Sequence, residues 1–261
     1  MTKLSIGQAW SETIAAVKRD GRLIVPVALA FAVIPATLFA LAVPPVPAGQ
    51  MREPGIWMVF YPLLILAALI GQMAIMRMAI GPAASVGEAI RHALRRAPSV
   101  IGAALIFVIP AIAILLPIAM PVLADPTNPP PTAALLFLAA TIALLCLWVR
   151  LMLMTAAGVA ETIGPVAIVK RSWALTRGNF WRLLAMTVLF GIVAWIAISA
   201  VQWVIGSVVI VALGKPESWS VSTLLVALIA AIAQTVASVL FAVLLARIYV
   251  QLAGGEPIKG I

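Results

Sequence analysis

Three arginines inside apolar segments are the residues of this sequence whose type and position could do chemistry. Arg77, Arg150 and Arg247 interrupt the stretches MAIMRMAI, LLCLWVRLMLM and VLLARIYVQLA. A guanidinium group is always charged and carries five N–H donors, so three of them facing inward as a cluster would hold a phosphate or a carboxylate. The apolar segments contain no acidic residue. The counter-charge would therefore be a ligand, a lipid headgroup or a loop acid such as Glu161.

The same three arginines also have a simpler explanation. Each is followed by several more apolar residues, and a charge at the centre of a bilayer costs about 2.5–3.5 kcal/mol. Near the end of a span, however, the long side chain can snorkel until its charge reaches the headgroups at a lower cost. The sequence leaves both alternatives open, with the arginines facing either outward to lipid or inward to one another.

Groups that usually carry out catalysis are missing from the sequence. It has no Walker motif, no paired carboxylates, no histidine cluster and no Gly-x-Ser-x-Gly turn. The one histidine, His92, falls on the polar face of a predicted amphipathic helix and has no other ligand residue beside it. We therefore expect no enzyme, no cofactor and no metal site.

The composition places the protein in a membrane. Apolar residues make up 64% of the 261 residues, charged residues 10%, and the mean hydropathy is +1.19. A soluble domain of this size could not keep so much apolar surface away from water. The net charge of +9 comes from basic residues that flank the apolar segments. We therefore expect anionic lipid headgroups as partners, and not nucleic acid.

Six apolar segments are long enough to span a membrane. A hydrocarbon core of about 30 Å needs roughly 20 helical residues. The segments cover residues 23–43, 57–80, 99–123, 132–158, 183–213 and 221–252. The fifth and sixth are longer than needed, so they must tilt, kink or protrude. The predicted fold is an all-α integral membrane protein with six transmembrane helices.

These segments form three repeats within a single polytopic domain covering residues 1–261. Each repeat has a basic amphipathic stretch, a helix breaker, an apolar span, and a second span with one arginine near its end. The repeats cover about residues 4–82, 84–160 and 161–253. We expect the breakers to end each amphipathic cytoplasmic helix and to turn the chain into the membrane. They are Asp20-Gly21, Ala97-Pro98 and Gly178-Asn179.

The starts of the three amphipathic helices have recognisable signals. Ser5 with Gln8, and Ser85 with Glu88, fit the capping box, in which a serine precedes Gln or Glu by three residues. In the third repeat Pro165 can occupy the first helical position, where its missing N–H costs nothing. Such helices would lie in the membrane interface with their cations among the headgroups.

Lysine and arginine are distributed asymmetrically. If the N-terminus is cytoplasmic, fifteen of the seventeen basic residues lie on the inner side, and only Arg52 and Lys215 lie in outer loops. The positive-inside rule then places both termini in the cytoplasm. Besides the three span arginines, the candidate headgroup contacts on this inner face are Arg19, Arg95, Arg96, Arg171, Arg177 and Arg182.

One motif in the third repeat carries a family resemblance. Residues 167–190 read AIVKRSWALTRGNFWRLLAMTVLF, with the match concentrated in RSW and LTRGNFW. This stretch resembles the membrane domain that precedes the catalytic domain in some bacterial glycerophosphoryl diester phosphodiesterases and that also exists alone. The SIGQAW and SVGEAI stretches and the six spans fit the same family. The resemblance implies a bacterial inner-membrane module near phospholipid metabolism. Because the sequence ends at Ile261, the catalytic barrel would be absent, and no catalytic residue is carried over.

The motif can also be interpreted physically. Gly178 and Asn179 are typical of a turn, and the rings that follow are typical of a membrane interface. The residues of this interfacial motif are Trp173, Gly178, Asn179, Phe180 and Trp181.

Two functions follow from these patterns. The first is a non-catalytic scaffold or anchor of the bacterial inner membrane, whose basic cytoplasmic face contacts anionic phospholipid or a partner protein. The second is a transporter or lipid-handling protein that uses Arg77, Arg150 and Arg247 as an anion or headgroup site. The orientation of these three side chains would distinguish the two.

Overall fold

The structure of the chain is a computed structural model that describes residues 4–43, 55, 57–81, 85–125, 128–214, 217 and 219–254. Over these residues the regular structure is entirely helical. The elements are α1 (Ile6–Ala28), the π-helical turn η1 (Leu29–Val33), α2 (Ile34–Ala42), α3 (Trp57–Ile80), α4 (Val86–Ala124), α5 (Pro131–Leu151), α6 (Met154–Ala160), α7 (Pro165–Thr176), α8 (Phe180–Leu213) and α9 (Val221–Leu252). The predicted outer-loop residues Arg52 and Lys215 lie outside the described residues.

Six helices in the described part of the chain are long and apolar enough to cross a membrane. They are Ile6–Ala42, Trp57–Ile80, Val86–Ala124, Pro131–Ala160, Phe180–Leu213 and Val221–Leu252. The second and sixth coincide with the segments predicted from the sequence. This confirms the all-α class and the number of spans, and it identifies a multi-pass membrane protein.

Two of the three predicted helix ends are wrong. α1 continues through Asp20 and Gly21, and α4 runs for 39 residues with Pro98 inside it. A proline removes one helix hydrogen bond, whereas ending the helix exposes several backbone groups that find no water beside an apolar segment. The third prediction is confirmed, because α7 ends at Thr176 and Gly178 has a φ of +87°.

Two other irregularities interrupt the long helices. The first predicted span contains the π-helical turn η1, which lies directly before Pro35. Since Pro35 has no N–H to bond the carbonyl of Phe31, the wider turn accommodates the missing hydrogen bond. The fourth predicted span, residues 132–158, is not one helix but two, with the break at Met152 and Leu153 between α5 and α6.

The predicted helix starts are confirmed. The Ser5 hydroxyl accepts a hydrogen bond of 3.4 Å from the Gln8 N–H. The second capping box is reciprocal: Ser85 Oγ accepts from the Glu88 N–H at 3.3 Å, and Glu88 Oε2 accepts from the Ser85 N–H at 3.1 Å. Pro165 is the first residue of α7.

The chain divides into two compact units. Unit 1 comprises Met1–Leu4, Arg96–Thr187 and Tyr249–Ile261, and unit 2 comprises Ser5–Arg95 and Val188–Ile248. Neither coincides with a predicted repeat, because the unit boundaries fall within α4, α8 and α9.

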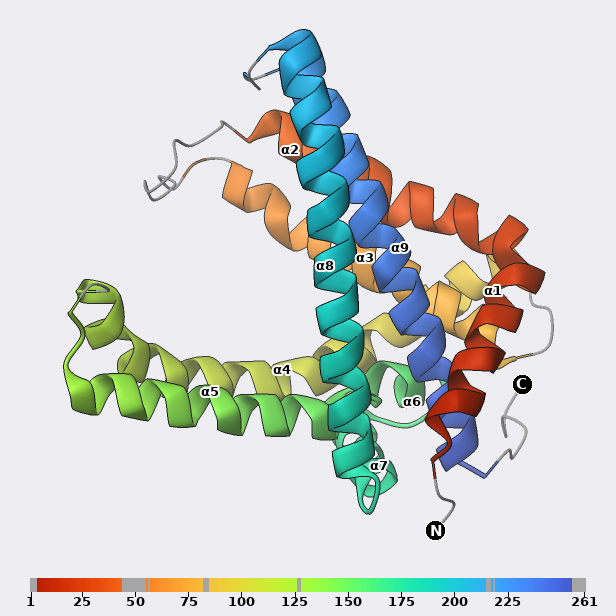
Figure 1. Cartoon of the computed structure of the whole chain (residues 1–261). Helices are drawn as coiled ribbons and strands as arrows, with labels where there is room; N and C mark the ends of the chain where they lie inside the picture. Colours follow the sequence, from red (N-terminus) through yellow and green to blue (C-terminus); the bar gives the residue numbers. More distant parts are fainter. Residues whose placement is uncertain are drawn as a thin grey trace. The chain divides into compact units, whose positions relative to one another are not determined.

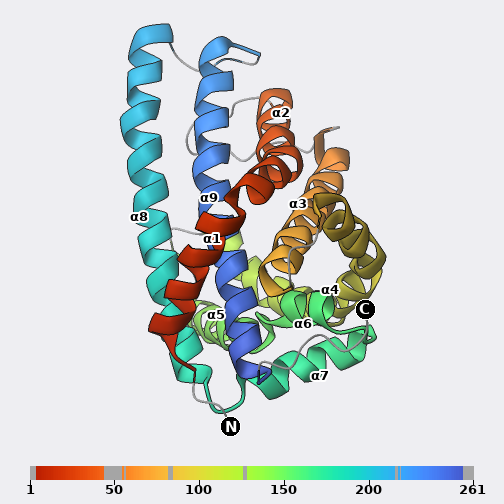
Figure 2. The same ribbon diagram turned by 90° about the vertical axis from the view of Figure 1, so that its right-hand side faces the viewer.

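Each unit contains paired helices. In unit 1, α4 and α5 run side by side (Figure 1) and share one apolar pocket. In unit 2, α8 and α9 run side by side in both views (Figures 1 and 2), with the rings of Phe190 and Phe241 5.0 Å apart between centroids. Also in unit 2, η1 approaches α3 so closely that a Cβ on Gly71 would lie 2.6 Å from Phe31 Cβ. A similar approach in unit 1 places the Gly158 Cβ position 2.5 Å from Val100 Cγ2.

Candidate functional site

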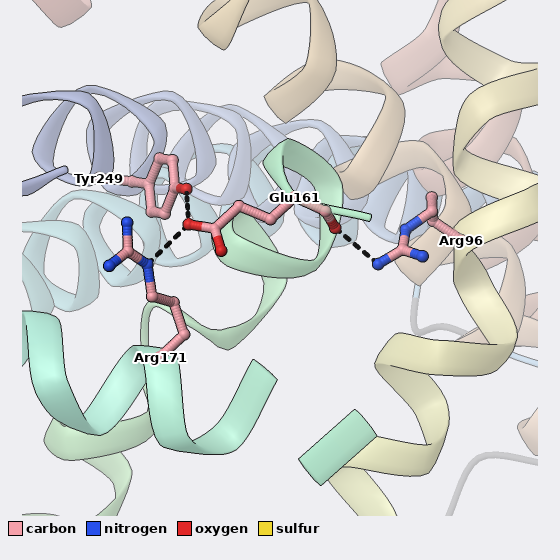
Figure 3. A network of polar contacts seen from close by, with 4 residues as sticks. All are labelled: Arg96, Glu161, Arg171 and Tyr249. Carbon is pink, nitrogen blue, oxygen red and sulfur yellow. Dashed lines mark hydrogen bonds and ion pairs between the residues drawn. The ribbon is translucent and has the colours of Figure 1, made fainter. Parts of the chain in front are cut away.

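A cluster of polar side chains lies where four elements of unit 1 meet. We call it the Glu161 cluster; its members are Arg96 of α4, Glu161, Arg171 of α7 and Tyr249 of α9 (Figure 3). α6 ends at Ala160, and Glu161 follows with extended backbone. Glu161 Oε1 accepts from Arg171 Nε at 2.7 Å and from the Tyr249 hydroxyl at 2.5 Å. One carboxylate thus joins the end of α6 to α7 and α9.

Arg96 satisfies the backbone at the end of α6. Its Nε donates to the Gly158 carbonyl at 2.9 Å, and its Nη2 donates to the carbonyls of Glu161 at 2.7 Å and Ile163 at 2.8 Å. The last carbonyls of a helix have no partner within the helix and need an external donor. A single guanidinium therefore caps α6 and holds the following loop against α4.

The electrostatics of the Glu161 cluster favour the ion pair. Partial burial alone would lower the pKa of Arg171, but the hydrogen bond and the charge of Glu161 raise that pKa above its ordinary value. The side chains of Arg171 and Glu161 are 41% and 26% exposed, so solvent weakens their attraction. Tyr249 is buried and needs the carboxylate as its acceptor. The cluster is a structural connection in which Arg171 is paired with Glu161 and Arg96 donates to backbone carbonyls.

Arg150 occupies a different environment in the same unit. It lies next to the last residue of α5, and its guanidinium carbon is 5.3 Å from the ring centre of Trp173 and 4.9 Å from that of Phe180. Both distances fit cation–π contacts. Its Nη1 is buried and has no hydrogen-bond partner among the described residues. We call this arrangement the Arg150 sandwich.

The backbone of Arg150 is bound to α7 independently of its side chain. Its carbonyl accepts from Ser172 Oγ at 2.9 Å and lies 3.3 Å from Thr176 Oγ1, which also lies 3.1 Å from the carbonyls of Ser172 and Trp173 within α7. These hydroxyls lie four residues apart, on one face of α7. Because α5 ends at Leu151, the Arg150 carbonyl lacks a partner within its own helix, and α7 supplies a donor.

The turn at Gly178 is also tied to the start of the chain. Asn179 Oδ1 accepts from the Leu4 N–H at 3.2 Å, and Arg182 Nη1 donates to the Leu4 carbonyl at 3.2 Å. Asn179 is buried, whereas the ring of Trp181 is 77% exposed. The predicted interfacial motif therefore contains both internal contacts and an exposed aromatic surface.

The comparison with known families can now be added to this geometry. A family model described as "Domain of unknown function (DUF7847)" matches residues 4–252. The chain belongs to the DUF7847 family. No curated protein and no solved structure matches it.

The other two span arginines of this DUF7847 protein belong to unit 2. Arg77 is 8% exposed, and its Nη1 lies 2.6 Å from the position that a Cβ on Gly81 would take. Arg247 is half-buried. The Nη1 of Arg77 and the Nε of Arg247 are buried without a hydrogen-bond partner among the described residues. None of the three span arginines is fully exposed, and Arg150 belongs to unit 1.

The remaining candidate arginines differ in whether they have an ion-pair or hydrogen-bond partner within the protein. Arg19 makes an ion pair of 2.7 Å with Asp20, and Arg96 and Arg171 belong to the Glu161 cluster. Arg95 and Arg177 are exposed and have no acceptor within the described part of the chain. Of these arginines, Arg95 and Arg177 are therefore the ones whose guanidinium groups are available to bind an external partner.

The sequence did not identify two features of this site. Glu161, a candidate counter-charge for the span arginines, pairs with Arg171 instead. Tyr249 follows Arg247 by two residues in an apolar segment, and its hydroxyl is the signal in the sequence for a buried polar partner. Within the described ranges, no group of His, Cys, Asp and Glu could hold a metal ion.

Proposed function

We propose that this DUF7847 protein is a non-catalytic scaffold or anchor of a bacterial inner membrane, with a basic face that contacts anionic phospholipid or a partner protein. Both termini would be cytoplasmic, and three helix-pair repeats with amphipathic helices would build that face. The observation that carries the proposal is the exposed surface around the α7–α8 turn, where Trp173, Arg177 and Trp181 are all exposed. Aromatic rings beside unpaired cations are typical of a membrane interface.

The link to glycerophospholipid metabolism is part of the same proposal. It is supported by the resemblance of residues 167–190 to the membrane domain of glycerophosphoryl diester phosphodiesterases. Several residues that carry the resemblance make defined contacts: Trp173 and Phe180 stack on Arg150, and Asn179 binds Leu4.

The orientation can be tested by cysteine labelling in intact cells. In a Cys146→Ala background, the variants Asn128→Cys and Arg177→Cys place one exposed thiol at each end of unit 1 helices. We expect a membrane-impermeant maleimide to label Asn128→Cys only. Labelling of Arg177→Cys in unbroken cells would contradict a cytoplasmic basic face.

The lipid preference can be tested by tryptophan quenching. The protein is reconstituted into phosphatidylcholine nanodiscs that contain either brominated phosphatidylglycerol or brominated phosphatidylcholine. We expect stronger quenching by the anionic lipid, a smaller difference in the double variant Arg95→Gln/Arg177→Gln, and a smaller difference at high salt. Equal quenching by the two lipids would argue against the lipid-contacting face. Lipid turnover or solute movement by the protein reconstituted alone would refute the scaffold function.

One observation favours the second candidate function, a transporter or lipid-handling protein. Arg77, Arg150 and Arg247 each have a buried guanidinium nitrogen without a hydrogen-bond partner within the described ranges. Such nitrogens are costly unless a ligand satisfies them. The test is uptake of radiolabelled glycerol 3-phosphate or inorganic phosphate into proteoliposomes. Uptake that Arg77→Leu, Arg150→Leu or Arg247→Leu abolishes would favour transport; no uptake by the unmodified protein favours the scaffold.

A further inference from the structure

An apolar groove runs between α4 and α5 in unit 1. It encloses about 390 Å³, and small side chains such as Ala111 on α4 and Ala140 and Ala143 on α5 leave the space. Phe107 and Leu147 are among the larger residues that line it. Both helices are candidate membrane spans, so in a membrane we expect the groove to face hydrocarbon. An acyl chain matches such a lining.

One residue that lines the groove is in contact with a cation. Trp173 of α7 lines the groove, and the same ring stacks on the Arg150 guanidinium at 5.3 Å. An apolar channel and a positive charge therefore meet at one aromatic side chain. This is the arrangement that an amphiphile with an apolar chain and an anionic head requires.

The depth of Arg150 suits a headgroup. It lies nineteen residues after Pro131, the first residue of α5, which is about 28 Å along a helix that rises 1.5 Å per residue. The hydrocarbon core is about 30 Å thick. If α5 spans the core, the guanidinium reaches the level of the phosphates on one side.

The charge of Arg150 has no acidic partner among the described residues. None of them accepts a hydrogen bond from its side chain, and Glu161, an acid of the same unit, is bound to Arg171 and Tyr249. Stacking on Trp173 and Phe180 orients the cation but leaves its donors unused. A phosphodiester anion would complete the site.

A second apolar pocket provides a contrast within the same molecule. It lies between α8 and α9 in unit 2, encloses about 530 Å³ and is lined by apolar side chains that include Trp10 and Ala233. No charged residue lines either pocket, but only the α4–α5 groove has a lining ring, that of Trp173, stacked on a cation. We therefore expect chains that enter the pocket of unit 2 to bind without a preference for an anionic head.

We propose that unit 1 holds one anionic phospholipid, with an acyl chain in the α4–α5 groove and its phosphate on Arg150. The proposal rests on the membrane function proposed above, and adds a defined site with one lipid in place of a diffuse basic face. For the apolar pocket of unit 2 we expect phosphatidylglycerol and phosphatidylcholine to bind equally well.

The test is native mass spectrometry of the full chain in a non-ionic detergent, titrated with dioleoylphosphatidylglycerol or dioleoylphosphatidylcholine. We expect one tightly held phosphatidylglycerol per chain. Arg150→Gln should weaken it by roughly tenfold or more, since a hydrogen bond to a charged group is lost. Arg95→Gln, an exposed arginine of α4, is the matched control and should leave this lipid in place. The Arg150 carbonyl keeps its bonds to α7 in these variants, and circular dichroism checks folding.

The groove is tested separately with a large side chain. Ala140→Phe should displace the tightly held phosphatidylglycerol, and Ala233→Phe, which fills the pocket of unit 2, should not. Soluble glycerol 3-phosphate should not compete at the same concentration, because it has no chain. Equally effective competition by glycerol 3-phosphate, or unchanged binding in both Arg150→Gln and Ala140→Phe, would overturn the proposal.

The outcomes also separate this proposal from the broader function. If Arg150→Gln and Arg95→Gln weaken phosphatidylglycerol binding equally, the basic face stands and the single site is overturned. If the unmodified protein holds phosphatidylcholine as tightly as phosphatidylglycerol, both the site and the lipid-contacting face are overturned.

Discussion

Arg96 in unit 1 and Arg77 in unit 2 are both partly or fully buried arginines, but they differ in how many hydrogen bonds their guanidinium groups make. Arg96 donates to three carbonyls around the end of α6, whereas Arg77 is 8% exposed and its Nη1 has no acceptor among the described residues. Both arginines lie near a helix end. Arg96 reaches across to the carbonyls at the end of another helix, whereas Arg77 lies in the last turn of its own helix, α3, and its carbonyl is bound by the Gly81 N–H at 3.1 Å. A buried arginine is satisfied where its side chain reaches carbonyls of a neighbouring element.

The largest expected effect is that of Arg96→Ala. It removes three charged hydrogen bonds and leaves the end of α6 uncapped, so we expect the free energy of unfolding to fall by about 3 kcal/mol. Denaturant titration in detergent micelles would measure this. The adjacent Arg95→Ala is the control and should change stability by no more than about 0.5 kcal/mol, because its side chain is exposed. Equal effects of the two variants would show that the carbonyl contacts carry no stability.

The Glu161 cluster should give the next largest effect. Glu161→Ala removes the acceptor of Arg171 and of buried Tyr249, and we expect a loss of about 2 kcal/mol. Glu161→Gln should lose less because an oxygen acceptor remains. The stability lost in the double variant Glu161→Ala/Tyr249→Phe should be smaller than the sum of the losses in the two single variants, and a double-mutant cycle would measure the difference.

The pH dependence of that contribution follows from Arg171. Its pKa is raised in the folded protein, so the pair stabilises the fold below the ordinary arginine pKa and is lost only as the pH rises above it. The difference between the unmodified protein and Glu161→Ala should therefore stay constant from a pH of about 7 to about 10. A difference that disappears within this range would mean that another group controls the cluster.

Gly81→Ala should have a smaller effect, in unit 2. The new Cβ would lie 2.6 Å from Arg77 Nη1, so the guanidinium must move, although it is the end of a flexible side chain. We expect a loss of about 1 kcal/mol. In an Arg77→Met background the same change should cost less, and a cost that is independent of residue 77 would place the strain in the backbone.

Arg77→Met alone should have the smallest effect. Its Nη1 is buried without an acceptor in the described part of the chain, so replacing it by an apolar side chain of similar length is expected to be neutral or stabilising, within about 1 kcal/mol. Thermal unfolding in detergent would check this. A loss as large as that of Arg96→Ala would reveal an acceptor for Arg77 in the folded protein.

The sequence predicted the features that depend on neighbouring residues. The bounds of α3 and α9, the serine cap at Ser5, the full capping box at Ser85 and the turn at Gly178 all follow from local composition and backbone preference. The breaks at Gly21 and Pro98 were predicted by the same reasoning and do not occur. There, apolar residues that follow favour a continuous helix more strongly than one glycine or proline opposes it.

The candidate site depended on residues that are distant in the sequence. Glu161 and Tyr249 are 88 positions apart, and nothing near either residue identifies the other. The aromatic motif is predicted to be interfacial, but the stacking of Trp173 and Phe180 on Arg150 joins residues 23 and 30 positions apart, and nothing near Arg150 identifies the two rings.

The carbonyl of Arg150 has one more consequence for unit 1. The Ser172 hydroxyl of α7 binds this oxygen atom at 2.9 Å, whereas the Thr176 hydroxyl lies 3.3 Å from it and 3.1 Å from the carbonyls of Ser172 and Trp173 in its own helix. A shift of α7 by one helical turn would break the Ser172 bond, while Thr176 would keep its acceptors within α7. The Ser172 bond therefore favours one axial register of α7 against α5, and a force that tilts α5 is transmitted to α7 through it.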